Sequence, residues 1–126
     1  MNTVFDFNEQ DRMCRLEVTV SKSLQELRFS AHYKGYRFLR VALMCTVEDQ
    51  TMTDQMAQRL YVKIAEECDS KVPNVARAIR NAIKNTWAVV PPDAAKKYFG
   101  YYDPNDFPCN KKFIATVADY IRLTIK

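Results

Sequence analysis

Basic and amide side chains gather on one face of a helix predicted over residues 73–88. At about 100° per residue, one side of this helix collects Val75, Ile79, Ala82, Ile83 and Thr86. The other side collects Asn74, Arg77, Asn81, Lys84 and Asn85, with Arg80 at its edge. Arginine can pair with guanine through two hydrogen bonds, asparagine can do so with adenine, and lysine attracts phosphate without reading sequence. These residue types predict contacts with the bases and phosphates of DNA.

The charge distribution favours the same segment. The chain has 126 residues and a formal charge of +4, and residues 71–90 hold four basic residues and no acidic one. The rest of the chain is balanced, so an anionic partner is expected at 71–90. The pattern alone slightly favours an ordinary solvated helix face, because arginine and lysine are common on helix exteriors. The absence of acidic residues over these twenty positions narrows the difference between the two interpretations without removing it.

The residues before this helix have the layout of a helix-turn-helix. Thr51 or Thr53 caps an amphipathic helix that reaches Glu67, and the polar break 68–71 follows. Asp69 is expected to adopt a left-handed conformation there, because its side chain can hydrogen-bond the local backbone. Pro73 suits a first helical turn. In such motifs the second helix enters the major groove of DNA.

The rest of the chain predicts an all-α domain of about six helices that contains this motif. Only two glycines are present, which is few for a sheet protein. Beside the two helices above, the expected helices cover 21–29, 36–47, 93–99 and 110–123. Gly35 is expected to end a turn, Gly100 to end a helix, and Asn110 to cap the last helix.

Residues 1–19 are expected to form a short N-terminal arm, and residues 20–126 the domain. Phe5 and Phe7 are isolated apolar anchors in a polar, acidic segment. Residues 14–20 alternate apolar and polar side chains, which is a strand pattern. The arm is therefore expected to be extended and to pair with itself or another chain, unless this segment is not a strand.

Several functions are disfavoured by what the sequence contains. The four cysteines form no CxxC pair and His32 is the only histidine, so we expect no metal site. No paired carboxylates or nucleophile–base set stands out, so we expect no enzyme and no cofactor. Without a signal peptide or an apolar span, we expect a cytoplasmic protein with reduced thiols and no membrane partner.

Two other groups of side chains have alternative interpretations. Met44, Met52 and Met56 could form an adaptable binding surface, although core filling is the commoner role. A loop at 101–109 is rich in aromatic residues and prolines. The aromatic side chains of Tyr98, Tyr101, Tyr102 and Phe107, in and just before this loop, could stack on bases, although core and loop anchors are the commoner role of such a cluster.

Beyond these patterns, the order and spacing of short strings resemble a known family over about a hundred residues. The strings are His32-Tyr33-Lys34-Gly35-Tyr36 with Leu39-Arg40, Leu60-Tyr61 with Ile64-Ala65, Arg77-Ala78-Ile79-Arg80 with Ala82-Ile83 and Trp87, Phe99-Gly100-Tyr101, Asn110, and Phe113-Ile114-Ala115 with Ala118-Asp119 and Arg122-Leu123. They resemble the C-terminal effector domains of the sporulation master regulator, stage-zero sporulation protein A. The resemblance implies a six-helix domain that binds DNA through a helix-turn-helix.

The resemblance also assigns the recognition helix to about 73–88. Arg77 and Arg80 match residues that contact DNA in the family. Asn74, Ala76 and Asn81 replace an arginine, a glutamate and a histidine, and Val89-Val90 replace an Arg-Gly turn. Base-reading positions thus differ while packing positions are kept. We expect the fold to be retained and the family's usual DNA target to be read differently.

The segment ahead of the match also departs from the family. Family members carry a phosphoacceptor receiver domain before the effector, whereas about 20 residues precede the match here. Dimerisation driven by phosphorylation in cis is therefore not expected. Family members bind tandem sites as neighbouring copies, which implies a homodimer on DNA.

Two functional hypotheses follow. The first is a sequence-specific, double-stranded DNA-binding transcriptional regulator without a receiver domain. Its expected DNA-binding residues are Ser70, Lys71, Asn74, Arg77, Arg80, Asn81 and Lys84. The second is a regulatory module that keeps the fold, has lost specific DNA reading, and binds RNA polymerase through its sigma subunit or binds a full-length family member.

Overall fold

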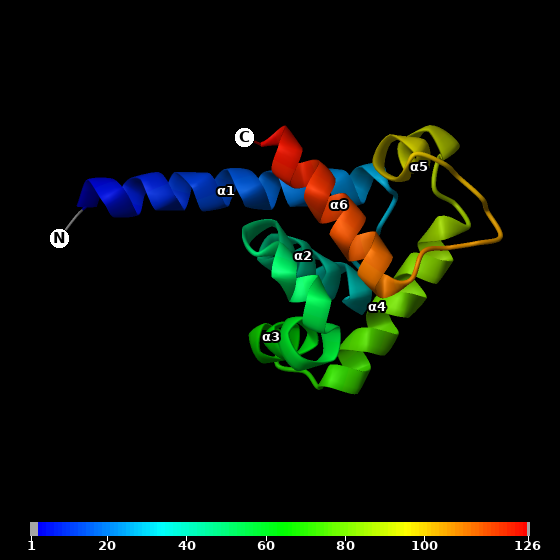
Figure 1. Ribbon diagram of the computed structural model, residues 1–126, viewed down its shortest axis with the longest axis horizontal. Helices are drawn as coiled ribbons and strands as arrows, with labels where there is room; N and C mark the ends of the chain where they lie inside the picture. Colours follow the sequence, from blue (N-terminus) through cyan, green and yellow to red (C-terminus); the bar gives the residue numbers. More distant parts are fainter. Residues whose placement is uncertain (1–2, 126) are drawn as a thin grey trace.

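The protein is an all-α domain in which helices surround one core. The computed structural model describes residues 3–125, with side chains from Asn8 onward. The elements in chain order are α1 (Thr3–Glu26), α2 (Lys34–Glu48), the 3₁₀ helix η1 (Gln50–Gln55), the π-helix η2 (Met56–Leu60), α3 (Tyr61–Glu67), α4 (Val72–Trp87), α5 (Pro92–Phe99) and α6 (Asn110–Thr124). Figure 1 shows α2 near the centre, with α1, α3, α4 and α6 around it. The prediction of an all-helical domain is confirmed.

The N-terminal segment is helical, so the prediction of an extended arm with a strand at 14–20 is wrong. Leu16, Val20 and Leu24 recur every fourth residue and are fully buried. Cys14 and Val18, which a strand would place beside Leu16 and Val20, are exposed. The alternating positions satisfied a helical period as well, and contact with the core selected the helix. The side chains of Phe5 and Phe7 lie outside the described residues.

α1 ends at Glu26, three residues before the predicted end of the helix over 21–29. Arg28 adopts the left-handed conformation, with φ of 72°. The Phe29 N–H donates a 2.9 Å hydrogen bond to the Leu24 carbonyl, which closes the helix end. Arginine is an uncommon residue in this conformation, so no sequence signal marked the stop.

The start of α2 packs directly on α4. Gly35, predicted to end a turn, lies in the first turn of α2 and is buried. A Cβ atom there would lie 2.5 Å from the Ala82 Cβ and 2.6 Å from the Ala78 carbonyl oxygen. The missing side chain therefore lets the two helices approach closely.

The single helix predicted up to Glu67 is divided into three segments of different winding, η1, η2 and α3. Asp49 caps the first, and its carboxylate accepts a 3.0 Å hydrogen bond from the Thr51 N–H. Arg59 pairs with the same carboxylate at 3.0 Å. This local network lies at the tight 3₁₀ turn, and a wider π-helical turn over Met56–Leu60 follows before α3.

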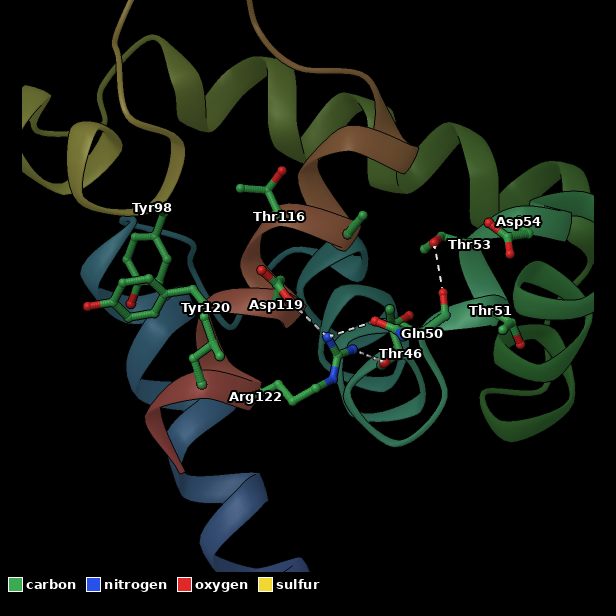
Figure 2. A pocket seen from close by; sticks show the side chains of 12 residues that line it. Thr46, Gln50, Thr51, Thr53, Asp54, Tyr98, Thr116, Asp119, Tyr120 and Arg122 are labelled. Carbon is green, nitrogen blue, oxygen red and sulfur yellow. Dashed lines mark hydrogen bonds and ion pairs between the residues drawn. The ribbon is translucent and has the colours of Figure 1, made fainter. Parts of the chain in front are cut away.

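α6 closes the domain and is fixed to the end of α2 by Arg122. The guanidinium donates hydrogen bonds to the carbonyls of Thr46 at 2.7 Å and Val47 at 3.2 Å. Figure 2 shows Arg122 directed at this helix end, with Asp119 behind it at 3.1 Å. A cation at the carbonyl end of a helix is favourable for the helix dipole. The N-cap of α6 is Cys109 rather than the predicted Asn110.

Two ion pairs tie α1 to the domain. Near the end of α1, Glu26 accepts hydrogen bonds from Lys97 at 2.9 Å and from the Tyr98 hydroxyl at 2.8 Å. Earlier in α1, Arg12 pairs with Glu48 at the end of α2 at 2.7 Å. Within the described residues, no helix combines the length and apolar character needed to cross a membrane.

These pairs predict a loss of stability in acid. The hydrogen bonds from Arg12 lower the pKa of Glu48. Burial acts to raise the pKa of Glu26, but the hydrogen bonds from Lys97 and Tyr98 outweigh burial, so the pKa of Glu26 is also lowered. A carboxylate whose pKa is lowered in the folded state stabilises the fold fully when the pH is above its ordinary pKa of 4.5. This stabilisation disappears as the pH falls through the lower pKa of the folded state. We expect the melting temperature, followed by circular dichroism, to fall below that pH. The double variant Glu26→Gln/Glu48→Gln should depend less steeply on acid, and an unchanged dependence would contradict the assignment.

Candidate nucleic-acid interface

α4 has one buried and one exposed face, as its sequence period predicts. The buried residues are Val75, Ile79, Ala82, Ile83, Thr86 and Trp87. The opposite face points to solvent along the helix, at the edge of the domain in Figure 1. The helix is therefore held by its apolar side, and its polar side is free to meet a partner.

The turn before α4 has a regular geometry. Asp69 has a φ of 52°, so the predicted left-handed conformation is confirmed. The Ser70 N–H donates a 2.9 Å hydrogen bond to the Ala65 carbonyl, which satisfies the end of α3. Lys71 is the N-cap residue of α4, and Pro73 lies in the first turn. The order α3, turn, α4 is compatible with a helix-turn-helix.

The structure brings the predicted DNA-binding residues onto one surface. Ser70 is half-buried in the turn, and the others are exposed along α4 and at its start. They are Lys71, Asn74, Arg77, Arg80, Asn81 and Lys84. The first turn is organised by a 3.4 Å hydrogen bond from Arg77 to the Asn74 side-chain oxygen. A surface of this composition can donate to base edges and phosphates.

The cations on this surface are electrostatically available. No ion pair joins any of the four to a carboxylate within the described residues, whereas Arg12, Arg15, Arg59, Lys63, Lys97 and Arg122 are all paired. An unpaired cation can bind phosphate without first breaking an internal pair. The face thus presents a local positive charge that the net charge of the chain understates.

Arg80 contacts an aromatic ring. Its guanidinium carbon lies 5.2 Å from the centroid of the Phe107 ring, in cation–π geometry. Phe107 belongs to the loop between α5 and α6. Trp87 anchors this loop at the end of α4, since its indole N–H donates to the Asp103 carbonyl at 2.8 Å and its own carbonyl accepts from the Tyr102 hydroxyl at 3.2 Å.

Asn110 holds the two helices of the motif against each other. Its side-chain amide donates to the hydroxyl of Tyr61, the first residue of α3, at 2.9 Å. It also donates to the carbonyl of Ala76 in α4 at 3.0 Å. One side chain from α6 thereby links α3 and α4, which fixes how α4 is presented.

Replacing Asn110 with alanine is expected to remove this link. We expect a loss of roughly 1–2 kcal/mol in the free energy of unfolding, because the hydroxyl of the buried Tyr61 and the Ala76 carbonyl lose a donor. Urea unfolding followed by Trp87 fluorescence measures the effect. Asn85→Ala alters an exposed asparagine of α4 and serves as the control. Equal stability of the Asn110 and Asn85 variants would contradict the bracing role.

Sequence reasoning missed the supporting residues rather than the exposed face. The sequence indicates Phe107 as a base-stacking residue or a loop anchor, and Asn110 as a helix cap. Their contacts cross long stretches of chain, so local patterns gave no signal for them. The other three aromatic residues have different surroundings. Tyr98, in α5, is buried, Tyr102 packs on Trp87, and Tyr101 is exposed beside Lys112.

A hollow beside α6, separate from the exposed face of α4, has side chains of a different chemistry. It measures about 620 Å³ and is open, with threonine, aspartate and tyrosine side chains on its walls. Figure 2 shows Arg122 at its base already engaged by the α2 carbonyls. Among the side chains that the structure describes, from Asn8 to Ile125, no three histidine, cysteine or carboxylate groups gather where they could hold a metal ion. The α4 surface remains the site with the most defined chemistry.

The fold and this surface together define a class of protein, a helical domain with an exposed basic helix of the kind that binds DNA. Comparison with protein families identifies the family. The family described as sporulation initiation factor Spo0A C terminal matches residues 20–121. The chain belongs to this family of DNA-binding sporulation effector domains, which is not an enzyme family. The match begins inside α1, so the first part of that helix lies ahead of it.

Proposed function

We propose that the protein is a transcriptional regulator that binds specific double-stranded DNA sequences through α4. The observation that carries the proposal is the exposed face of α4, where four cations without described ion-pair partners stand beside two exposed asparagines, Asn74 and Asn81. In helix-turn-helix proteins the second helix lies in the major groove and its N-terminal residues read the bases. Family membership supports the same orientation here.

The residues have separable roles in this proposal. Asn74 and Arg77 lie in the first half of α4 and would contact base edges, with Arg80 and Asn81 reading bases or adjoining phosphates. Ser70, Lys71 and Lys84 would contact phosphates, which set the position of the protein without specifying sequence. Because asparagine favours adenine, the expected target differs from one read by the family's arginine and histidine at the positions of Asn74 and Asn81.

Selection of bound duplexes from a random DNA pool tests the proposal directly. We expect a discrete motif, with at least one position that changes when Asn74→Ala is used in place of the unaltered protein. Enrichment of no motif would contradict sequence-specific reading. Family membership also supports binding by neighbouring copies, in which case the motif is repeated in tandem.

A protein-interaction role is the second candidate, and one observation favours it. Val89 is 67% exposed just beyond α4, where the resembling family has an Arg-Gly turn. An exposed apolar side chain in place of a basic one suits a protein contact, such as one with RNA polymerase, better than a phosphate contact. A discrete DNA motif that is bound equally well by Val89→Arg would count against this role as the main function.

Phe107 is expected to support DNA binding through Arg80 without touching DNA itself. Phe107→Ala frees the guanidinium and should weaken binding to the selected duplex about twofold to fivefold, as expected for losing about 0.5–1 kcal/mol of cation–π interaction. Phe107→Tyr keeps the ring and should retain binding. In the Arg80→Ala background Phe107→Ala should have no further effect on the dissociation constant. An additive effect there would contradict the positioning role.

A further inference from the structure

An open groove runs along α2 on a different part of the domain from α4. It measures about 660 Å³. Figure 1 shows α2 lying between α1 and α3. Residues of both α1 and α3 line the groove beside those of α2. Its lining residues come from α1, α2 and the segment from Asp49 to Cys68, and none comes from α4. A partner seated there would leave the candidate DNA interface uncovered.

The floor of the groove is apolar and adaptable. Val41, Met44 and Cys45 form a stripe at helical spacing on α2, and Met52 and Met13 flank it. All five are half-buried, and the four other than Met13 pack on the core while still reaching the groove. Burial raises the pKa of the Cys45 thiol, which keeps it neutral. Flexible, polarisable methionine side chains can adapt to the apolar side chains of a partner.

The charges around the floor are not balanced along its length. Glu48, Asp49 and Glu67 are paired with Arg12, Arg59 and Lys63 at 2.7, 3.0 and 3.6 Å. By contrast, Arg37 and Arg40 form no ion pair with a carboxylate in the described part of the chain. Among the acidic residues that line the groove, Glu17 is the only one without an ion-pair partner in the described part of the chain. An adjoining hollow that shares Glu17 and Arg40 adds Lys22.

The unpaired cations lie toward one end of the groove. Arg37 and Arg40 are in the first half of α2, which begins at Lys34. The N-terminal end of a helix carries a partial positive charge, so the helix dipole adds to these cations. The groove therefore combines an apolar floor with one cationic end, which complements a ligand with an apolar stripe and carboxylates beside it.

We propose that this groove binds an acidic amphipathic helix of another protein. The apolar side chains of the helix rest on Met13, Met44 and Met52, and its carboxylates face Arg37 and Arg40. Binding of an amphipathic helix in a groove uses anchors at helical spacing, and the floor stripe on α2 has this spacing. Met13 and Glu17 lie ahead of the family match, so part of the groove wall is supplied by the N-terminal portion of α1.

Methionine methyl groups report occupancy of the groove directly. The probes are two stapled peptides of about 14 residues, or four turns, with leucine on one face and either glutamate or lysine on the other. We expect the glutamate peptide to cause saturable NMR shifts at the methyl groups of Met13, Met44 and Met52. Met56 does not line the groove and should be unaffected. The lysine peptide should bind about tenfold more weakly or not at all.

Charge reversal locates the contact. Arg37→Glu/Arg40→Glu should weaken binding of the glutamate peptide by about tenfold or more and improve that of the lysine peptide. Lys96→Glu/Lys111→Glu makes the same charge change at exposed residues outside the groove and should alter binding little. Thermal unfolding of both variants verifies the fold. Absent shifts with the glutamate peptide, equal binding of both peptides, or equal weakening by the control variant would overturn the proposal.

Discussion

Replacing Arg77 and Arg80 together with alanine is expected to lower affinity for the selected DNA duplex by roughly 100-fold or more. Each arginine that reads a base or binds a phosphate contributes on the order of 1–3 kcal/mol to the specific complex. Neither side chain is buried in α4, so the fold should be retained. Fluorescence anisotropy with the selected duplex at two salt concentrations measures the change. If either contact is to phosphate, the slope of log affinity against log salt also falls by about 0.9 per contact.

The matched control removes two positive charges elsewhere. Lys22→Ala/Lys96→Ala alters exposed cations of α1 and α5 and should leave DNA affinity within a few-fold of the original protein. If both double variants lose affinity equally, binding depends on net charge rather than on the α4 face. If neither loses affinity, α4 is not the DNA-binding element, and the protein-interaction hypothesis becomes the better account.

The second large effect is expected on stability, from Gly35→Ala. The new methyl group would lie 2.5 Å from the Ala82 Cβ and 2.6 Å from the Ala78 carbonyl oxygen. Both obstacles belong to α4, and the carbonyl is backbone, so relief requires α2 and α4 to move apart. We expect a loss of about 2–3 kcal/mol in the free energy of unfolding, toward the upper end for overpacked cores. Urea unfolding measures it, and Ala82→Gly should rescue it only in part because the carbonyl remains.

The other glycine provides a comparison of mechanism. Gly100 has a φ of +84° and open space around its Cα, so Gly100→Ala introduces backbone strain without a clash. We expect a loss of about 1 kcal/mol there, and a smaller loss for Gly100→Asn, since asparagine tolerates the left-handed region. If Gly35→Ala proves no more harmful than Gly100→Ala, the close approach of α2 and α4 is not required.

Local signals predicted the parts of the fold that depend on local physics. The helical period of 73–88 gave both faces of α4, because that helix lies at the edge of the core and buries one side. Asp69 and Gly100 were expected at helix ends and both adopt positive φ. These features depend on residues within one or two turns of each other, and a single sequence contains that information.

Segments whose conformation depends on distant contacts were not predictable in the same way. Residues 14–20 satisfy both a strand and a helix period, and burial of Leu16 and Val20 against the core decides between them. Arg28 takes a left-handed conformation that its residue type disfavours. The 3₁₀ and π segments before α3 arise from the network around Asp49 and have no simple sequence signature.

The candidate site likewise has one part that the sequence predicts and another that it does not. Which side chains α4 exposes follows from its period, so Arg77 and Asn81 could be placed from the sequence. How firmly α4 and its side chains are held depends on Phe107 and Asn110. Phe107 contacts Arg80 from the loop before α6, and Asn110 contacts the Ala76 carbonyl from the first turn of α6. Residue types alone gave these two several possible roles, and only the packing of α6 beside α4 distinguishes them.

Because α1 is continuous, the segment from Thr3 to the core is a rigid helix rather than a flexible linker. The helix runs unbroken from Thr3 into residues that the core buries, such as Leu16 and Val20. Any domain joined ahead of Thr3 by continued helix would be held in fixed rotational phase with α4. One inserted residue would turn it by about 100° and shift it by about 1.5 Å. The orientation of the joined domain relative to α4 would therefore repeat with roughly every 3.6 residues added to the helical linker. A flexible linker would instead let the joined domain sample many orientations.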